Sequence, residues 1–133
     1  MAYIISIANE KGGVAKTTTT LSLGGALVEM GKKVLLLDLD PQSNLTLSLG
    51  VETDQKVSSL LNLVLDKLNP TEVIIKTQIS GLELFPSNGD IRMAERLLTM
   101  QPNYQLILKN ILSTVENNYD FIILDCPPFL GAI

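Results

Sequence analysis

Residues 11–18 read Lys11-Gly12-Gly13-Val14-Ala15-Lys16-Thr17-Thr18, and this stretch decides how the rest of the chain is interpreted. It follows an apolar run at residues 3–8, which is typical of a strand, and it leads into a pattern typical of a helix. Glycines let backbone N–H groups approach phosphate oxygens, the start of a helix offers unpaired N–H donors, and lysine adds a positive charge. The stretch therefore predicts a phosphate-binding loop between a strand and a helix.

The loop departs from the common pattern G-x-x-x-x-G-K-[ST] at two positions. Glu10 stands at the first glycine position and Ala15 at the second, while Lys16 and Thr17 remain in register. The chain instead has the form K-G-G-x-x-K-T, with an additional lysine, Lys11, at the start of the loop. The methyl group of Ala15 requires a negative φ at that position.

Two further stretches accompany this loop. Residues 35–42 read LLLDLDPQ, and residues 121–128 read FIILDCPP. With these segments in this order, the chain resembles the ParA/Soj/MinD family of deviant Walker ATPases, and their spacing favours the ParA/Soj partition branch. The first of the two looks like the family's D-x-D-P-Q segment and the second like its Walker B strand. The resemblance covers nearly the whole chain and is loosest in the middle.

Composition limits the class of protein. The 133 residues suit one domain, and 46% apolar residues with 5% aromatic residues predict an aliphatic core, as in buried parallel strands. A net charge of −4 argues against a broadly basic surface for nucleic acid, although it leaves room for a local basic patch. Cys126 is the single cysteine and histidine is absent, which excludes an internal disulfide and histidine-based catalysis.

The same features predict a cytoplasmic protein. One cysteine fits a reducing compartment, no apolar run approaches the roughly 20 residues of a membrane-spanning helix, and the first residues lack a signal peptide pattern. We therefore expect no membrane association.

The hydrophobic pattern alternates between strands and helices. Strands are expected at residues 3–8, 34–38, 73–75, 82–85 and 121–124, the first of them buried and the last fully apolar. Helices are expected at residues 17–30, ending before Gly31, and at 43–50, 57–68, from Asp90 through Met93 and Leu97, and at 104–115, with Pro70 ending the third segment. A strand, a helix and a second strand form a right-handed crossover with parallel strands. Asp125 then follows a strand at the edge where ligands bind in open α/β sheets.

The predicted fold is therefore α/β, a P-loop NTPase type mostly parallel sheet flanked by helices. The chain is expected to form a single, partial nucleotide-binding domain over residues 1–133. Because family members continue through further strands and helices, the resemblance implies that the C-terminal part of the family fold is lacking and that the chain is an N-terminal piece.

The resemblance implies that ATP binds at the loop. Lys16 should contact the β- and γ-phosphates and Thr18 the α-phosphate. A solvated surface lysine is the alternative for Lys16, but a positive charge at a helix N-terminus is unfavourable without an anion. The nucleotide-binding residues are expected to be Lys11, Gly12, Gly13, Val14, Ala15, Lys16, Thr17 and Thr18.

The resemblance also implies a Mg²⁺ ion and catalytic groups. Thr17, Asp40 and Asp125 are the expected metal residues, and Asp40 should also orient or activate the attacking water. Lys11 should reach across a dimer interface to the partner's ATP, so Lys11, Lys16 and Asp40 are the expected catalytic residues. The alternatives are an N-terminal hydroxyl cap for Thr17, a turn residue for Asp40 and a surface lysine for Lys11.

The function implied is that of a Mg²⁺-dependent ATPase for plasmid or chromosome partition, located at the nucleoid in the full-length family member. ATP should drive homodimerisation and nonspecific DNA binding, and a ParB-like partner should stimulate hydrolysis. Two alternatives remain open, a MinD-like membrane-associated switch and a catalytically inert nucleotide-binding fragment.

Overall fold

Five strands form one sheet in the computed structural model, which describes residues 2–8, 13–40, 42–51, 63, 68–87, 99 and 101–126. In chain order the strands are β1 (Tyr3–Ile7), β2 (Val34–Asp38), β3 (Ile75–Lys76), β4 (Leu82–Phe85) and β5 (Phe121–Asp125). They lie side by side in the order β1-β5-β2-β4-β3. The pairs β1–β5, β5–β2 and β2–β4 are parallel, and the short β3 pairs antiparallel with β4. The predicted mostly parallel α/β sheet is therefore confirmed.

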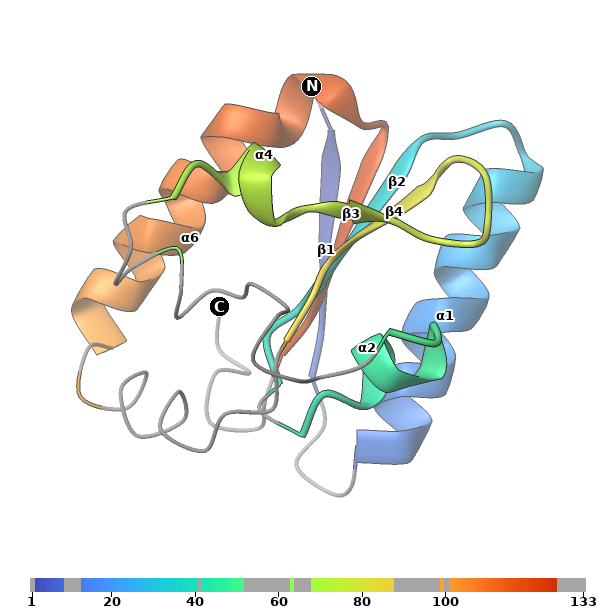
Figure 1. The fold of residues 1–133 in the computed structure, drawn as a ribbon, viewed down its shortest axis with the longest axis horizontal. Coiled ribbons are helices and arrows are strands. Elements are labelled where there is room, and N and C mark those ends of the chain that lie inside the picture. Colours follow the sequence, from blue (N-terminus) through green and yellow to red (C-terminus); the bar gives the residue numbers. More distant parts are fainter. Residues whose placement is uncertain are drawn as a thin grey trace.

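Helices cover both faces of the sheet (Figure 1). The helical elements are α1 (Gly13–Glu29), α2 (Asn44–Ser48), α4 (Pro70–Val73), α6 (Gln101–Val115) and the 3-10 turn η1 (Glu116–Asn118). Helices α1 and α2 lie on one face, and α4 and α6 lie on the other. The described residues thus form three layers, helix, sheet and helix.

The side chains of β2 alternate between the two layers of helices. Leu35 and Leu37 pack with Ile111 of α6, whereas Val34 and Leu36 pack with Leu27 of α1. All five side chains of β2, including Asp38, are fully buried, as expected of a central parallel strand covered on both faces. Aliphatic packing on both sides of the sheet therefore fixes the position of α1 relative to the carboxyl ends of the strands.

The strand at residues 3–8 was expected to be buried, and this expectation is wrong. Tyr3 is 72% exposed and Ile4 is 45% exposed. Among the described residues, β1 pairs only with β5, so it forms an edge of the sheet. The aromatic ring of Tyr3 stacks on Phe121 of β5, with ring centroids 5.4 Å apart.

The strand expected at residues 73–75 is also wrong in part, because Val73 belongs to α4 and the strand begins at Ile75. Asn69 caps α4: its side chain accepts from Thr71 N, and the Glu72 carboxylate accepts from Asn69 N. Pro70 therefore begins a helix here, which suits its fixed φ and missing N–H.

The other expected helices differ in how closely their predicted bounds agree with the structure. The helix expected at 17–30 begins earlier, at Gly13, and Gly31 follows it with a left-handed φ of 82°. The helix expected at 104–115 also begins earlier, and the segment 43–50 contains α2. Most of the helix expected at 57–68, and the whole helix expected from Asp90 through Met93 and Leu97, lie outside the described residues. Within the described part of the chain, no helix is long and apolar enough to cross a membrane.

Candidate functional site

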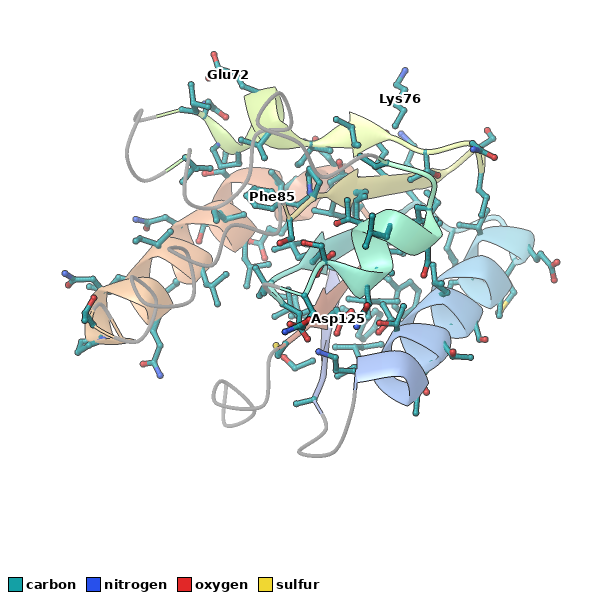
Figure 2. The ribbon with its side chains drawn as sticks, turned by 60° about the horizontal axis from the view of Figure 1, so that its bottom comes forward. Glu72, Lys76, Phe85 and Asp125 are labelled. Atoms are coloured by element: carbon teal, nitrogen blue, oxygen red, sulfur yellow. The ribbon has the colours of Figure 1, made fainter. Side chains whose placement is uncertain are left out.

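The carboxyl ends of β2 and β5 meet the first turn of α1. Asp38 and Asp125, the last residues of these two strands, are register partners, and Ile7 at the end of β1 is the partner of Asp125 on the other side. Figure 2 shows Asp125 beside the start of α1. Crossover connections bring these strand ends and this helix end together, so residues far apart in the sequence share one site.

Lys16 lies at the centre of the site, on the first turn of α1. Its ammonium donates hydrogen bonds to Asp40 Oδ2 at 2.6 Å and to the carbonyl oxygen of Cys126 at 2.7 Å, and it lies 2.8 Å from Asp125 Oδ1. The Lys16 side chain is 1% exposed. A lone buried ammonium would be very costly, so the two carboxylates offset its loss of water.

Burial and ion pairing shift the pKa of Lys16 in opposite directions. Burial lowers the pKa of Lys16, but Asp125 and Asp40 outweigh it and leave this pKa above its ordinary value. Burial also raises the pKa of Asp125, and the nearby Lys16 opposes that rise without cancelling it. Lys16 therefore remains protonated at neutral pH.

Two buried groups at the site have oxygens that lack hydrogen bonds within the described part of the chain. They are the Thr17 hydroxyl and both carboxylate oxygens of Asp125. Thr17 is close enough to lower the pKa of Asp125, but its hydroxyl does not meet hydrogen-bond geometry, and Lys16 meets Asp125 as an ion pair only. Buried oxygens of this kind normally have a partner. A hydroxyl and a carboxylate are hard oxygen donors, so they fit a Mg²⁺ ion.

Asp40 combines a turn with a contact to Lys16. Its Oδ1 accepts from Gln42 N at 3.0 Å and its backbone carbonyl accepts from Ser43 N at 2.9 Å, which closes a tight turn after β2. Its Oδ2 is the oxygen that contacts Lys16. The turn interpretation and the site interpretation of Asp40 are therefore compatible, because each uses a different oxygen.

The Asp38 carboxylate contacts helix α2. Its Oδ2 accepts from the backbone N–H and the hydroxyl of Thr46, and its Oδ1 accepts from Asp40 N at 3.2 Å. Burial raises the pKa of Asp38 to about 7, although the Thr46 hydrogen bonds act against this rise. Sequence reasoning missed Thr46 and its neighbours Ser43 and Ser87, which complete this network.

Of the remaining predicted site residues, some are described by the structure and the others are not. Gly13, Val14 and Ala15 begin α1, so Ala15 has the negative φ that its methyl requires, and Thr18 lies exposed on the same helix. Lys11 and Gly12 lie outside the described residues, as do Pro127 and Pro128.

A lysine on the first turn of the helix that follows β1, held against carboxylates at the ends of neighbouring parallel strands, defines a P-loop type of nucleotide-binding protein. The AAA domain family model matches residues 2–133 of the chain. The chain belongs to this family, as a P-loop ATPase of the ParA/Soj/MinD group.

Relatives and solved structures agree with this assignment. The chain is similar to the sporulation initiation inhibitor protein Soj of Bacillus subtilis, with 40% identity over 133 residues that cover 100% of the chain and 53% of Soj. It is 34% identical over 132 residues to the chromosome partitioning protein ParA of Caulobacter vibrioides, covering 98% of the chain and 49% of ParA. The chain spans about half the length of these curated relatives.

Among solved structures, cobyrinic acid a,c-diamide synthase from Mycobacterium smegmatis with bound ADP and magnesium is similar to this chain. The TM-score is 0.86 and the identity is 43%, covering 98% of this chain and 53% of that one. A further structure of that protein holds an ATP analogue and magnesium.

Proposed function

We propose that residues 1–133 form one nucleotide-binding domain of a Mg²⁺-dependent partition ATPase, in which ATP drives homodimerisation and nonspecific DNA binding. The observation that carries the proposal is the contact of Lys16 with both Asp40 and Asp125 at the start of α1. The similarity to Soj and ParA supports the partition role, and the magnesium nucleotides in the similar solved structures support the choice of ligand.

In this proposal the loop and the first turn of α1 bind the triphosphate. Lys16 contacts the β- and γ-phosphates, Thr18 contacts the α-phosphate, and the backbone of residues 12–15 encloses them. Lys16 must then leave part of its contact with Asp40 and Asp125, which its long flexible side chain permits. Lys11 reaches the nucleotide of the partner subunit in the dimer.

Thr17, Asp125 and Asp40 are the residues that would hold Mg²⁺. When bound, the ion neutralises negative charge on the phosphates. The Thr17 hydroxyl and Asp125 Oδ2, buried oxygens without a hydrogen bond among the described residues, support this assignment. Asp40 orients the attacking water, and its turn hydrogen bonds restrict where its carboxylate can lie.

The similarity to cobyrinic acid a,c-diamide synthase favours a second candidate, a nucleotide-dependent synthase, over the same residues. The two candidates share the magnesium nucleotide site and differ in what ATP binding does next. Only the partition ATPase requires dimers that form with ATP, bind DNA and respond to a ParB-like protein. A MinD-like membrane switch and an inert fragment are further alternatives, and an inert fragment would show no ATP turnover.

The first experiment measures Mg²⁺-ATP binding by calorimetry for the wild type, Lys16→Gln and the control Lys109→Gln, which changes an exposed lysine of α6. Glutamine keeps a donor toward Asp40 and Asp125 but removes the charge. We expect Lys16→Gln to weaken binding by at least about 30-fold, since a charge-assisted contact contributes about 2 kcal/mol or more. Lys109→Gln should bind as the wild type does. Equal affinities of the wild type and Lys16→Gln would refute the site.

The same preparations separate binding from turnover and from dimerisation. Asp40→Asn should bind Mg²⁺-ATP within about threefold of the wild type and lose turnover by at least about 100-fold, as expected for a group that acts on the nucleophile. Sedimentation with a non-hydrolysable ATP analogue should show dimers, and DNA should bind only in that state. Monomers that bind the analogue would contradict the partition proposal while leaving the nucleotide site in place.

A further inference from the structure

A buried network of hydrogen bonds connects Asp38 to the segment that follows β4. The Thr46 hydroxyl donates to Asp38 Oδ2 and accepts from Ser87 N at 3.0 Å. Ser87 Oγ lies 2.9 Å from Ser43 Oγ, within hydrogen-bond distance. One hydroxyl, that of Thr46, therefore joins the end of β2, helix α2 and the residues after β4.

The network is closed to water. Asp38, Thr46 and Ser87 have no exposed surface, and Ser43 is 1% exposed. Water cannot replace a lost partner in such a place, so each hydrogen bond that is lost here costs about 1–3 kcal/mol. The network thus has few alternative arrangements.

Asp40 lies between Asp38 and Thr46 in the chain and is bonded to the same carboxylate as Thr46. Asp40 N donates to Asp38 Oδ1 at 3.2 Å, and Thr46 N donates to Asp38 Oδ2 at 2.9 Å, so one carboxylate holds both ends of the segment. Ser43, inside the segment, has a left-handed φ of 59°. A residue other than glycine is unfavourable in this conformation and is kept there only by its surroundings.

We propose that Thr46 is a positioning residue: through Asp38 and Ser87, its hydroxyl holds the turn that the hydrogen bonds of Asp40 with Gln42 and Ser43 define, so that the Asp40 carboxylate faces Lys16 at the start of α1. Thr46 does not itself contact Lys16. Its effect reaches the site through the backbone of Asp40 and through the position of the Asp40 carboxylate. The catalytic consequence rests on the ATPase function proposed above, whereas the effect on the turn does not.

The first test uses the nucleotide-free protein. Thr46→Val keeps the shape and the β-branch of the side chain but removes the hydroxyl. We expect hydrogen exchange at the amides of Gln42 and Ser43, which bond to Asp40, to accelerate at least about tenfold, a change equivalent to about 1.4 kcal/mol. Exchange at Leu36 and Ile123, in the central strands, should stay as in the wild type. Unchanged exchange at Gln42 and Ser43 in a folded variant would overturn the proposal.

The second test measures ATP turnover. Thr46→Val should lower kcat at least about tenfold and change KM less than about threefold, because a small misplacement of a reacting group costs rate more than binding. Thr46→Ser restores the hydroxyl and should recover most of kcat. Thr114→Val, which removes an exposed hydroxyl of α6, is the matched control and should leave both constants unchanged.

The outcomes separate the two proposals. If Thr46→Val does not fold, the same measurements are made on Thr46→Ala, which removes the γ-methyl group together with the hydroxyl. A wild type that shows no turnover refutes the ATPase function, and the exchange measurement still decides whether Thr46 holds the turn. A folded variant with disturbed exchange but wild-type kcat, or a loss that Thr46→Ser does not restore, would refute the positioning role.

Discussion

Thr17 and Thr20 are both buried threonines of α1, and they differ in what their hydroxyls contact. The Thr20 hydroxyl donates to the carbonyl oxygen of Lys16 at 3.0 Å, whereas the Thr17 hydroxyl has no hydrogen-bond partner among the described residues. A buried hydroxyl without a partner destabilises a fold, and functional sites often contain such groups. The two residues therefore separate a structural hydroxyl from one available to a ligand.

We expect Thr17→Val to leave the free energy of unfolding unchanged or to raise it by about 1 kcal/mol, while Thr20→Val lowers it by about 1 kcal/mol. Urea denaturation measures both. In calorimetry, Thr17→Val should lose most of the dependence of ATP binding on Mg²⁺, and Thr20→Val should keep it. Equal destabilisation by the two substitutions would mean that the Thr17 hydroxyl has a partner in the folded protein.

At the residue scale, sequence reasoning found the groups that the structure brings together, but not what holds them. Lys16, Asp40 and Asp125 belong to contiguous motifs, so each is visible by its neighbours in the chain. Thr46 and Ser87 make hydrogen bonds between segments about 40 residues apart. An isolated hydroxyl residue belongs to no sequence pattern from which such a bond can be predicted. Their role follows only from the packing of α2 against the ends of β2 and β4.

At the element scale, α1 contains two adjacent glycines in different environments. A Cβ atom at Gly24 would lie 3.2 Å from a methyl carbon of Leu36 in β2 and 3.4 Å from one of Leu82 in β4, whereas a Cβ at Gly25 would meet nothing within 4 Å. Gly24 therefore permits the close approach of α1 to the sheet. Gly25 has no such role and only lowers the helix propensity of α1.

Gly25→Ala should raise the free energy of unfolding by about 0.5–1 kcal/mol, the usual gain for this change inside a helix. Gly24→Leu should lower it by about 1–3 kcal/mol, because a large side chain there must displace Leu36 and Leu82. Thermal unfolding of the two variants beside the wild type tests both signs. Similar melting temperatures for the two would show that α1 can move away from the sheet without cost.

Elements differ in how far the sequence predicts them. The central strands β2 and β5 are apolar up to the aspartate that ends each of them, which is the pattern of strands covered on both faces. The helix α4 was missed although Asn69, Pro70 and Glu72 form an N-cap, a first-turn proline and a capping box. The exposure of β1 could not be predicted, because its sequence is as apolar as that of a central strand and its neighbours depend on the order of strands in the sheet.

At the scale of the whole molecule, the end of the sheet opposite Asp125 is held by a different set of polar contacts. The Tyr119 hydroxyl donates to Glu83 Oε1 at 2.6 Å, which ties the segment after η1 to β4. Nearby, Lys33 N donates to Asp120 Oδ2 at 2.8 Å, so the segments that lead into β2 and β5 are joined as well. These bonds keep the strands in register at the end remote from the site.

Burial, reinforced by Glu83, raises the pKa of Tyr119 above its ordinary value of 10.0. Above about pH 10 the unfolded chain therefore loses this proton while the folded protein keeps it, so stability should fall as the pH rises. Tyr119→Phe should be less stable than the wild type by about 1 kcal/mol at pH 7 and should lose less stability above pH 10. Urea denaturation from pH 7 to pH 11 measures this loss of stability. The loss in Glu83→Gln is expected to lie between those of the wild type and Tyr119→Phe. If the stability of the wild type and of Tyr119→Phe fell equally with pH, the pH dependence would not come from Tyr119.

The ion pairs of Lys16 have a thermodynamic consequence for ligand binding. Without nucleotide, the ammonium is already neutralised by the chain's own carboxylates, Asp40 and Asp125. An anion that arrives alone has to separate these pairs and leave two buried carboxylates uncompensated, so we expect free phosphate to bind poorly. A divalent cation that arrives with the anion relieves that penalty, and nucleotide and cation should each strengthen the binding of the other. Such reciprocal coupling would make the site respond to the complex of the two instead of to either one.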